Sequence, residues 1–541
     1  MRIHKKEGKT RINRAVPVLA AAFLALAAAA PSWAQTPPQA RPPDADPILR
    51  LSLDECIART LKNNLGLAVE MLTPRLLDEQ VALAGEKFFP TLTFAYSDQD
   101  TKTASYSFLD ASDIVSTAQD ENTTTLSQFL PTGGTLTASL YNYSTDSNRS
   151  FQTINPRYGS TLRFNFSQPL LKDFGFKAGR REIIVARYSR DMSEENFNAA
   201  LENAIYNAES AYWNLVHSIE SLGVRRQSLK LAEELLEKNK AELEAGTLAP
   251  IEILTAEAEV SLRRAEILEA EALVRNNEEL VKTIINLAAE RDDVKAVRVA
   301  PTDTPVADRT EVDFDGALVT ALQKRPDLKA LRLDVQSREF GVGMARNQLL
   351  PDVRLQLSYW SPGISGTRIL YKDNNALSGI IVGKIEGKKS DALRDAFDFT
   401  YKNSALGFTV SLPVNTILSR AAYAQSRVGL DQAVLRVKNQ EQQLTLELGN
   451  AVRAVETNYQ RTEAYKAARD LAQRKLEAEL EKFKVGLSTN YLVLQFQRDL
   501  ANAQTLELKA LIDYKISQAA LDKVMGVGRT RLNVNVIEES E

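Results

Sequence analysis

The sequence predicts an α+β membrane protein in which one unit of strands and long helices occurs twice. Three observations lead to this fold class. Four segments alternate apolar and polar residues with a period of two, which is typical of strands with one dry and one wet face. Apolar residues recur every seven positions over six heptads, which indicates a long coiled-coil helix. The two halves of the chain align at an offset of 261 residues.

Residues 1–34 have the three parts of a secretory signal peptide. Basic residues precede an apolar run, Ala15–Ala30, and a small-residue site ending at Ala34 follows it. A membrane anchor helix is the alternative, but the run is short and rich in alanine, so we expect cleavage after Ala34. Residues 35–50 contain many prolines and are predicted to be an extended arm.

Charge and cysteine content narrow the function classes. The chain has a formal net charge of −3, and the signal peptide contributes +6 − 1 = +5, which leaves about −8 for the rest. This acidic balance argues against a nucleic acid as partner. The only cysteine, Cys56, is predicted to be a small buried apolar residue. No stretch after the signal approaches eighteen consecutive apolar residues, so strands would have to form any membrane-inserted part.

The repeat predicts the domain organisation. Pairs at the offset of 261 include Leu61 with Leu322, Leu67 with Leu328, Pro90 with Pro351 and Ser97 with Ser358. Pro169 matches Pro413 and Gly246 matches Gly486 at offsets of 244 and 240. We expect a first repeat at 51–290 with strands in 91–168, a linker at 291–311, a second repeat at 312–525 with strands in 352–412, and a tail at 526–541.

The predicted strands have an apolar and a polar face. A soluble sandwich would alternate in the same way, but Arg163 and Arg354 suit a water-filled lumen, and the aromatic residues Tyr359 and Trp360 suit a membrane interface. The predicted lipid-facing residues are Leu92, Phe94, Tyr96, Leu162, Phe164, Phe166, Leu355, Trp360 and Phe408. The predicted lumen-facing residues are Arg163, Asn165, Arg354 and Gln356. Four strands cannot close a barrel, since about eight are needed, so this interpretation requires an oligomer.

Three further segments lie between the predicted strands. A tight turn at 131–134 is predicted to join 124–130 to 135–143. Its alternation is less regular, and the sequence leaves open whether this hairpin adds barrel strands or folds elsewhere. Two polar stretches, 101–122 and 362–401, are predicted to be long loops.

The long helices extend far beyond the size of an ordinary domain. About seventy-five residues separate Pro169 from the turn at Gly246, and a helix of that length spans roughly 100 Å. A free coiled-coil dimer is the alternative, but the strands at one end argue against it. The heptad residues are Leu201, Ala208, Leu215, Leu222, Leu229, Leu236 and Leu243.

The sequence offers no candidate for catalysis, for a cofactor or for a metal. The only histidine after the signal peptide, His217, follows a heptad residue and is predicted to be structural. No cysteine pair, phosphate-binding glycine loop or metal-spaced cluster is present in the sequence. We therefore expect a protein that is not an enzyme.

Both long helices are predicted to break at a glycine, Gly246 or Gly486, and to return as antiparallel partners. These paired tips, the opening helix at 51–64, the segment Gln168-Pro169-Leu170-Leu171 and the two-copy layout resemble the TolC-type outer-membrane efflux protein family over nearly the whole chain after the signal. No single motif is decisive, but their order and spacing carry the resemblance.

The resemblance implies a homotrimer whose barrel of twelve or more strands lies in outer-membrane lipid and continues as an α-helical tunnel. It also implies that a periplasmic adaptor (membrane fusion) protein and an inner-membrane pump dock at the tips. The implied docking residues are Gly246, Thr247, Leu248, Pro250, Gly486, Ser488 and Thr489. The tunnel-mouth candidates are Glu252, Gln495 and Asp499. Some members have an acidic ring after the second tip, where this chain has Leu492 and Gln495.

The expected function is that of a passive exit duct in a tripartite efflux or type I secretion system, driven by its partner pump. The cargo and the class of pump are left open. The alternative is a periplasmic coiled-coil adaptor or scaffold without a pore. Such a protein would share the signal peptide and the hairpins, but it would lack the strands and the full repeat.

Overall fold

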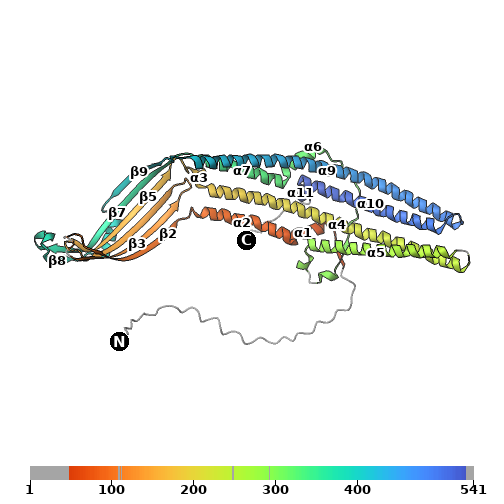
Figure 1. Cartoon of the computed structure of the whole chain (residues 1–541), viewed down its shortest axis with the longest axis horizontal. Coiled ribbons are helices and arrows are strands. Elements are labelled where there is room, and N and C mark those ends of the chain that lie inside the picture. The colour runs from red at the N-terminus through yellow and green to blue at the C-terminus, as the bar shows by residue number, and fades with distance from the viewer. Residues whose placement is uncertain (1–47, 108–109, 111, 247–248, 291–292, 532–541) are drawn as a thin grey trace, which may run out of the picture. The chain divides into compact units, whose positions relative to one another are not determined.

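The computed structural model describes residues 48–107, 110, 112–246, 249–290 and 293–531. The predicted signal peptide, most of the predicted arm, and Thr247 and Leu248 of the first tip lie outside the described residues. Residues from Ile48 onward form one unit. In this unit a β-sheet lies at one end and long helices extend from it (Figure 1).

Seven strands form the main sheet, and all of its pairings are antiparallel. The order is β2-β3-β4-β5-β7, after which β9 pairs with the half of β7 near the helices and β8 with its distal end. The hairpin that the sequence left unplaced is β3–β4, in the middle of the sheet. The strands are β2 (Thr91–Ala104), β3 (Ile114–Phe129), β4 (Thr135–Ser147), β5 (Ile154–Pro169), β7 (Asp352–Tyr371), β8 (Ile381–Ile385) and β9 (Asn403–Ser411).

The predicted loops at 101–122 and 362–401 are largely wrong. β2 continues to Ala104 and β3 begins at Ile114, so most of the first stretch is strand. The second stretch contains the distal half of β7, the strand β8 and the helix α8 (Lys389–Phe397). In the first stretch, β2 and β3 have mostly polar side chains on both faces, as where Asp98 lies opposite Asp120. Backbone hydrogen bonds form this part of the sheet without any apolar alternation.

The helices of the two halves correspond in order and length. α1 (Leu53–Asn63) and α2 (Leu65–Glu86) have the same lengths as α6 (Phe314–Lys324) and α7 (Pro326–Asn347), and each lies 261 residues before its counterpart. The long pair α4 (Arg181–Glu244) and α5 (Pro250–Ile284) corresponds to α9 (Ile417–Lys484) and α10 (Asn490–Met525). At 64 and 68 residues, α4 and α9 each span about 100 Å. In the described part of the chain, no helix is both long and apolar enough to cross a membrane.

Two short helices continue two longer ones end to end. Asn64, which caps the start of α2, donates a hydrogen bond to the carbonyl of Ile284 at 3.1 Å. Asn286, just after α5, donates in return to the carbonyl of Asn63 at 3.0 Å. In the second half, Gly526 follows α10 and packs against the backbone of Arg325, the residue that precedes α7. α2 therefore continues the line of α5, and α7 that of α10. Helices extend in this way from the tips to the sheet, although α5 and α10 end in the middle of the unit.

The middle of the unit is more ordered than the sequence suggested. Residues 48–50, predicted to end an extended arm, belong to β1 (Ile48–Leu51), which pairs in parallel with β6 (Arg298–Pro301) inside the predicted linker. The buried hydroxyl of Tyr212 donates to Asp303 at 2.7 Å, and that of Tyr514 donates to the carbonyl of Asp308 at 2.6 Å. Two buried tyrosines thus hold the connection between the halves against the long helices.

Cys56 is buried, as the sequence predicted. Its side chain is 1% exposed, within the apolar cluster that α1, α4 and the end of α5 share. Burial raises the pKa of the Cys56 thiol to about 12, so the thiol remains protonated and unreactive at neutral pH.

Candidate functional site

One face of the sheet carries a continuous apolar band. In an antiparallel sheet, directly opposed residues point to the same face. The register pairs Leu92 with Leu126, Leu136 with Phe166, Phe164 with Tyr359, and Leu355 with Phe408. All predicted lipid-facing residues except Trp360 lie on this face: Leu92, Phe94, Tyr96, Leu162, Phe164, Phe166, Leu355 and Phe408. Many of them are exposed, among them Leu92 at 69% and Phe408 at 63%.

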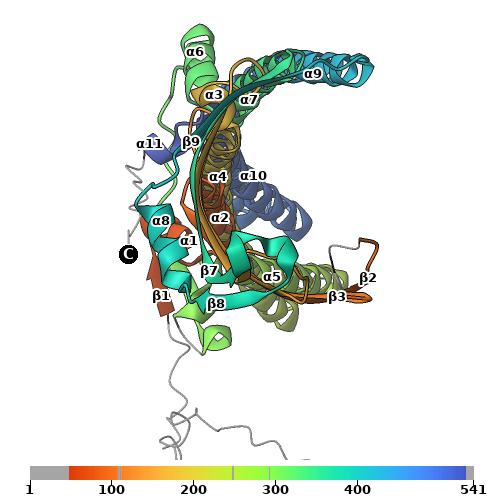
Figure 2. The same cartoon turned by 90° about the vertical axis from the view of Figure 1, so that its left-hand side faces the viewer.

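Helix α8 lies over the distal end of the same face. Ala392 and Ala396 are fully buried against β5 and β7, and a Cβ added at Gly363 would overlap the carbonyl of Ala392. Phe399, just after α8, stacks on Tyr359 and Phe164 with ring centroids 5.5 and 6.5 Å apart. Figure 2 shows α8 on the convex side of the curved sheet, so the apolar band is on the convex side and the other face is concave.

The concave face is polar. The predicted lumen-facing residues Arg163, Asn165, Arg354 and Gln356 all lie on it, among many serines and threonines. The prediction that Trp360 shares a face with the other predicted lipid-facing residues is wrong. Trp360 lies directly opposite Arg163, and the Arg163 guanidinium is 5.1 Å from the centroid of the indole ring. The strand alternation continues unbroken through Trp360, which places the ring on the polar face.

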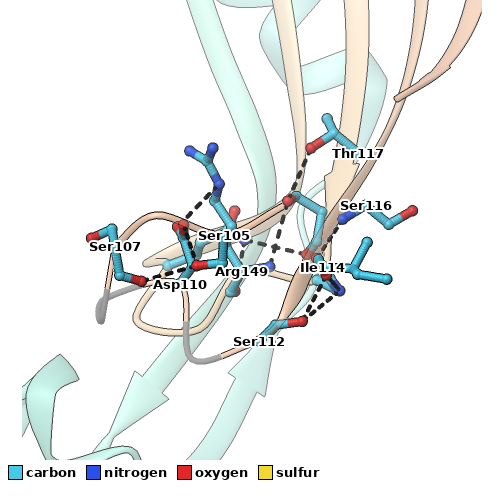
Figure 3. A network of polar contacts seen from close by, with 11 residues as sticks. Ser105, Ser107, Asp110, Ser112, Ile114, Ser116, Thr117 and Arg149 are labelled. Atoms are coloured by element: carbon cyan, nitrogen blue, oxygen red, sulfur yellow. Dashed lines mark hydrogen bonds and ion pairs between the residues drawn. The ribbon is translucent and has the colours of Figure 1, made fainter. Parts of the chain in front are cut away.

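At the distal end of the strands, polar contacts link neighbouring turns to each other (Figure 3). Asp110, which is only 7% exposed, accepts a hydrogen bond from the Ser105 hydroxyl at 3.1 Å and forms an ion pair with Arg149 at 3.4 Å. Asn148 donates to the carbonyl of Ile114 at 2.9 Å and accepts from the backbone N–H of Ser116 at 2.8 Å. The turn between β2 and β3 is therefore held to the turn between β4 and β5.

Both edges of the sheet are open in the single chain. Within the described residues, β2 pairs only with β3, and β9 pairs only with β7. Every residue of β2 is exposed, and most of β9 is exposed as well. An open edge presents unpaired backbone donors and acceptors, together with apolar side chains here, and is suited to pairing with another strand.

The far ends of the long helices form two tips. Gly246 and Gly486 have φ values of +75° and +78°, which end α4 and α9. Pro250 is the first residue of α5. Thr489 caps α10 by accepting from the N–H of Leu492 at 3.4 Å, and the Ser488 hydroxyl donates to Glu479 at 2.7 Å. Five large apolar residues beside the tips are exposed: Ile251, Leu254, Val485, Leu487 and Tyr491.

The predicted tunnel-mouth residues differ in exposure. Glu252 is half-buried, and one of its carboxylate oxygens has no hydrogen-bond partner among the described residues. Gln495 is half-buried, whereas Asp499 is exposed. Among the described residues, no hydrogen bond or ion pair joins these three side chains.

Sequence analysis missed Arg263, which joins the two hairpins near the tips. Its side chain is 4% exposed. It donates to the carbonyls of Ser228 at 2.6 Å and Leu494 at 3.0 Å, and to the side chains of Glu259 at 3.1 Å and Gln497 at 3.3 Å. The available signal was its position in the apolar spacing of α5, where Ala256, Val260, Ala270 and Val274 are buried. A charged residue at such a seam position needs partners from neighbouring helices.

Comparison with known proteins agrees with this architecture. The chain is 22% identical over 478 residues to the outer membrane efflux protein BepC of Brucella suis, which covers 88% of this chain and 85% of BepC. It resembles the solved structure of the outer-membrane channel OprN with a TM-score of 0.61 at 16% identity, over 88% and 89% of the two chains. The Campylobacter jejuni CmeC outer membrane channel has a TM-score of 0.60 at 18% identity, over 88% and 86%.

The family comparison covers both halves of the chain. The sequence model described as "Outer membrane efflux protein" matches residues 135–287 and 317–527, which together are more than half of the chain. The resemblance to TolC-type proteins that the order of the motifs predicted is therefore confirmed. The chain belongs to the outer membrane efflux protein family.

Proposed function

We propose that the chain is one wall segment of an oligomeric, passive exit duct in the outer membrane, with its helices in the periplasm. The main support is the sheet itself, which combines an apolar convex face, a polar concave face and two open edges. A wall of this kind buries its apolar band in lipid and leaves a wet interior. The helices α4 and α9, each about 100 Å long, would continue that interior away from the membrane.

Closure of the wall requires other copies of the chain. Pairing of β2 of one copy with β9 of the next would satisfy both edges, and cyclic symmetry would repeat that contact until the ring closes. The sequence predicted four strands in each chain and left open whether the hairpin at 124–143 adds two more. The structure has six long strands, β2–β5, β7 and β9. Three copies would therefore form a wall of 3 × 6 = 18 strands. Barrels of about this size leave an aqueous channel.

The partners would act at the helix tips. The exposed apolar residues beside Gly246 and Gly486 are suited to contact a periplasmic adaptor protein, which would link the duct to an inner-membrane pump. The two tips differ in sequence, with Pro250 and Glu252 in one and Asn490 and Leu492 in the other. A trimer would thus offer two alternating kinds of hairpin for docking. The pump would supply the energy for export.

Fractionation of cells that produce the chain tests this proposal. We expect the protein only in the detergent-solubilised outer membrane, as an oligomer that dissociates on heating. A pore-free adaptor or scaffold, the second candidate, would be recovered without detergent. Recovery as a soluble monomer would contradict the proposed function.

A further inference from the structure

The concave face has very few charges. Where the register is regular, β2, β4 and β9 place no ionisable acid or base of the Asp, Glu, Lys or Arg type on this face. As far as the register shift between Ile154 and Arg157, the other described strands contribute five such residues: Glu121, Arg157, Arg163, Asp352 and Arg354. Most remaining positions are serine, threonine, asparagine or glutamine. The few charges therefore dominate the electrostatic field of this surface.

Three of these five charged side chains have a hydrogen-bond or ion-pair partner within the sheet. Arg354 forms an ion pair with Asp352 at 2.9 Å, and the two charges offset each other near the helical end. Glu121 accepts a hydrogen bond from the hydroxyl of Tyr141 at 2.7 Å. One of the two Glu121 carboxylate oxygens therefore already has a donor.

The other two charges, Arg157 and Arg163, lie on β5 and have no carboxylate within ion-pair distance among the described residues. Each guanidinium lies over an aromatic ring instead. Arg157 is 5.3 Å from the centroid of Tyr143, and Arg163 is 5.1 Å from that of Trp360. Both arginines are exposed. An aromatic ring orients a guanidinium but leaves its N–H donors free for a ligand.

The position of Tyr143 is fixed by its cross-strand partner. Tyr143 lies opposite Gly159, and a Cβ added at Gly159 would overlap the Tyr143 ring. The ring can therefore lie flat over the strand, next to Arg157. Backbone and aromatic residues together hold both guanidinium groups on the concave surface.

We propose that Arg157 and Arg163 form an anion-binding surface in the duct that favours solutes bearing carboxylate, phosphate or sulfate groups. The inference rests on the proposed function, because it takes the concave face to line the lumen. With Glu121 counted against the two free arginines, each chain contributes 2 − 1 = +1 to the regularly paired part of this face. A closed ring repeats these guanidinium groups around the lumen, as in pores that select anions through rings of arginine.

The test measures ion selectivity of the full-length oligomer in planar lipid bilayers under a potassium chloride gradient. We expect a reversal potential whose sign shows that the channel prefers chloride to potassium. The double substitution Arg157→Gln and Arg163→Gln shifts it towards potassium. Arg157→Lys with Arg163→Lys keeps the charge and retains the chloride preference. Glu121→Gln increases that preference, and this shift does not depend on changing either arginine.

Arg394→Gln is the matched control, because it removes the same charge from the exposed surface of α8 on the convex side. It leaves the reversal potential unchanged. A cation-selective wild-type channel, or a double glutamine variant with the wild-type reversal potential, overturns the inference while the duct itself stands. An oligomer that inserts but carries no current overturns the proposed function and this inference with it.

Discussion

Arg263 donates a hydrogen bond to the backbone carbonyl of Leu494 at 3.0 Å and so joins α5 of the first hairpin to α10 of the second across 231 residues of sequence. The same guanidinium reaches the Ser228 carbonyl on α4. Three helices therefore share one buried cation near the tips. Its pKa is lowered because burial disfavours the charged form, while Glu259 opposes this effect.

Arg263→Met should loosen the contact between the hairpins. The substitution leaves the buried carbonyls of Ser228 and Leu494 without their donor, and loss of one partner from a buried charged network costs about 3 kcal/mol. Thermal unfolding and limited proteolysis of the purified oligomer measure the effect. Arg264→Ala is the control, since this exposed residue pairs only with Glu233 in the described structure and should change stability by about 0.5 kcal/mol or less. Equal effects of the two substitutions would contradict the role of Arg263.

Gly246→Val and Gly486→Val should distort the tips while sparing the sheet. Both glycines have positive φ, and a β-branched residue there costs on the order of 1–3 kcal/mol of local strain. Export should fall while the amount of protein in the outer membrane stays normal. Gly223→Ala, in the middle of α4 where a Cβ meets open space, is the control and should export normally. Normal export by both valine variants would argue against docking at the tips.

The second tip should open at low pH. The hydrogen bond from Ser488 is the main reason why the pKa of Glu479 is lowered, and Lys482 lowers it further. Because the pKa of Glu479 is lowered in the folded state, the ionised carboxylate stabilises the tip at pH values above the ordinary glutamate pKa. This stabilisation is lost as the pH falls through the lowered pKa. The protection factors of the amides of residues 485–492 in hydrogen exchange, corrected for the intrinsic rate at each pH, should therefore fall as the pH falls from about 6 to about 3. Ser488→Ala should move the onset to higher pH, and an unchanged onset would refute the assignment.

Helix α8 should depend on the close approach at Gly363. A Cβ there would overlap the carbonyl of Ala392, so Gly363→Val should displace α8 from β5 and β7. Protease added to intact cells should then cut within residues 388–401. Gly383→Val is the control, because its Cβ would meet Leu370 at an ordinary 3.6 Å. If both variants resist the protease equally, α8 does not rely on this contact.

The strands with one apolar face could be predicted from the sequence. The alternation around Phe164, Leu355 and Phe408 identified three strands and their apolar face from sequence alone. The distal half of β2 and most of β3 escaped prediction because both of their faces are polar, and only backbone pairing defines them. This is why the sequence predicted four strands and left the hairpin at 124–143 open, where the structure has six long strands.

The contacts between the halves were harder to predict. Glycine and proline spacing predicted both tips, since positive φ ends a helix wherever it occurs. The partners of Arg263 lie on other helices, and no local pattern identifies a carbonyl 231 residues away.

The wrong prediction for Trp360 has another cause. Aromatic residues at a strand end suggested a lipid interface, but the period of two places the ring beside Arg163.

Cysteine cross-linking between β2 and β9 shows whether three copies of the chain close into one wall. The native Cys56 is buried and unreactive, so it gives little background. Cysteines are placed in pairs on the concave faces of the two edge strands, with Thr93, Ala95 or Ser97 replaced on β2 and Ala405, Gly407 or Thr409 replaced on β9. If three copies close the wall, one register of pairs, oxidised in the outer membrane, yields covalent dimers and trimers and nothing larger. Only monomers in every register, or an open ladder beyond three copies, would contradict it.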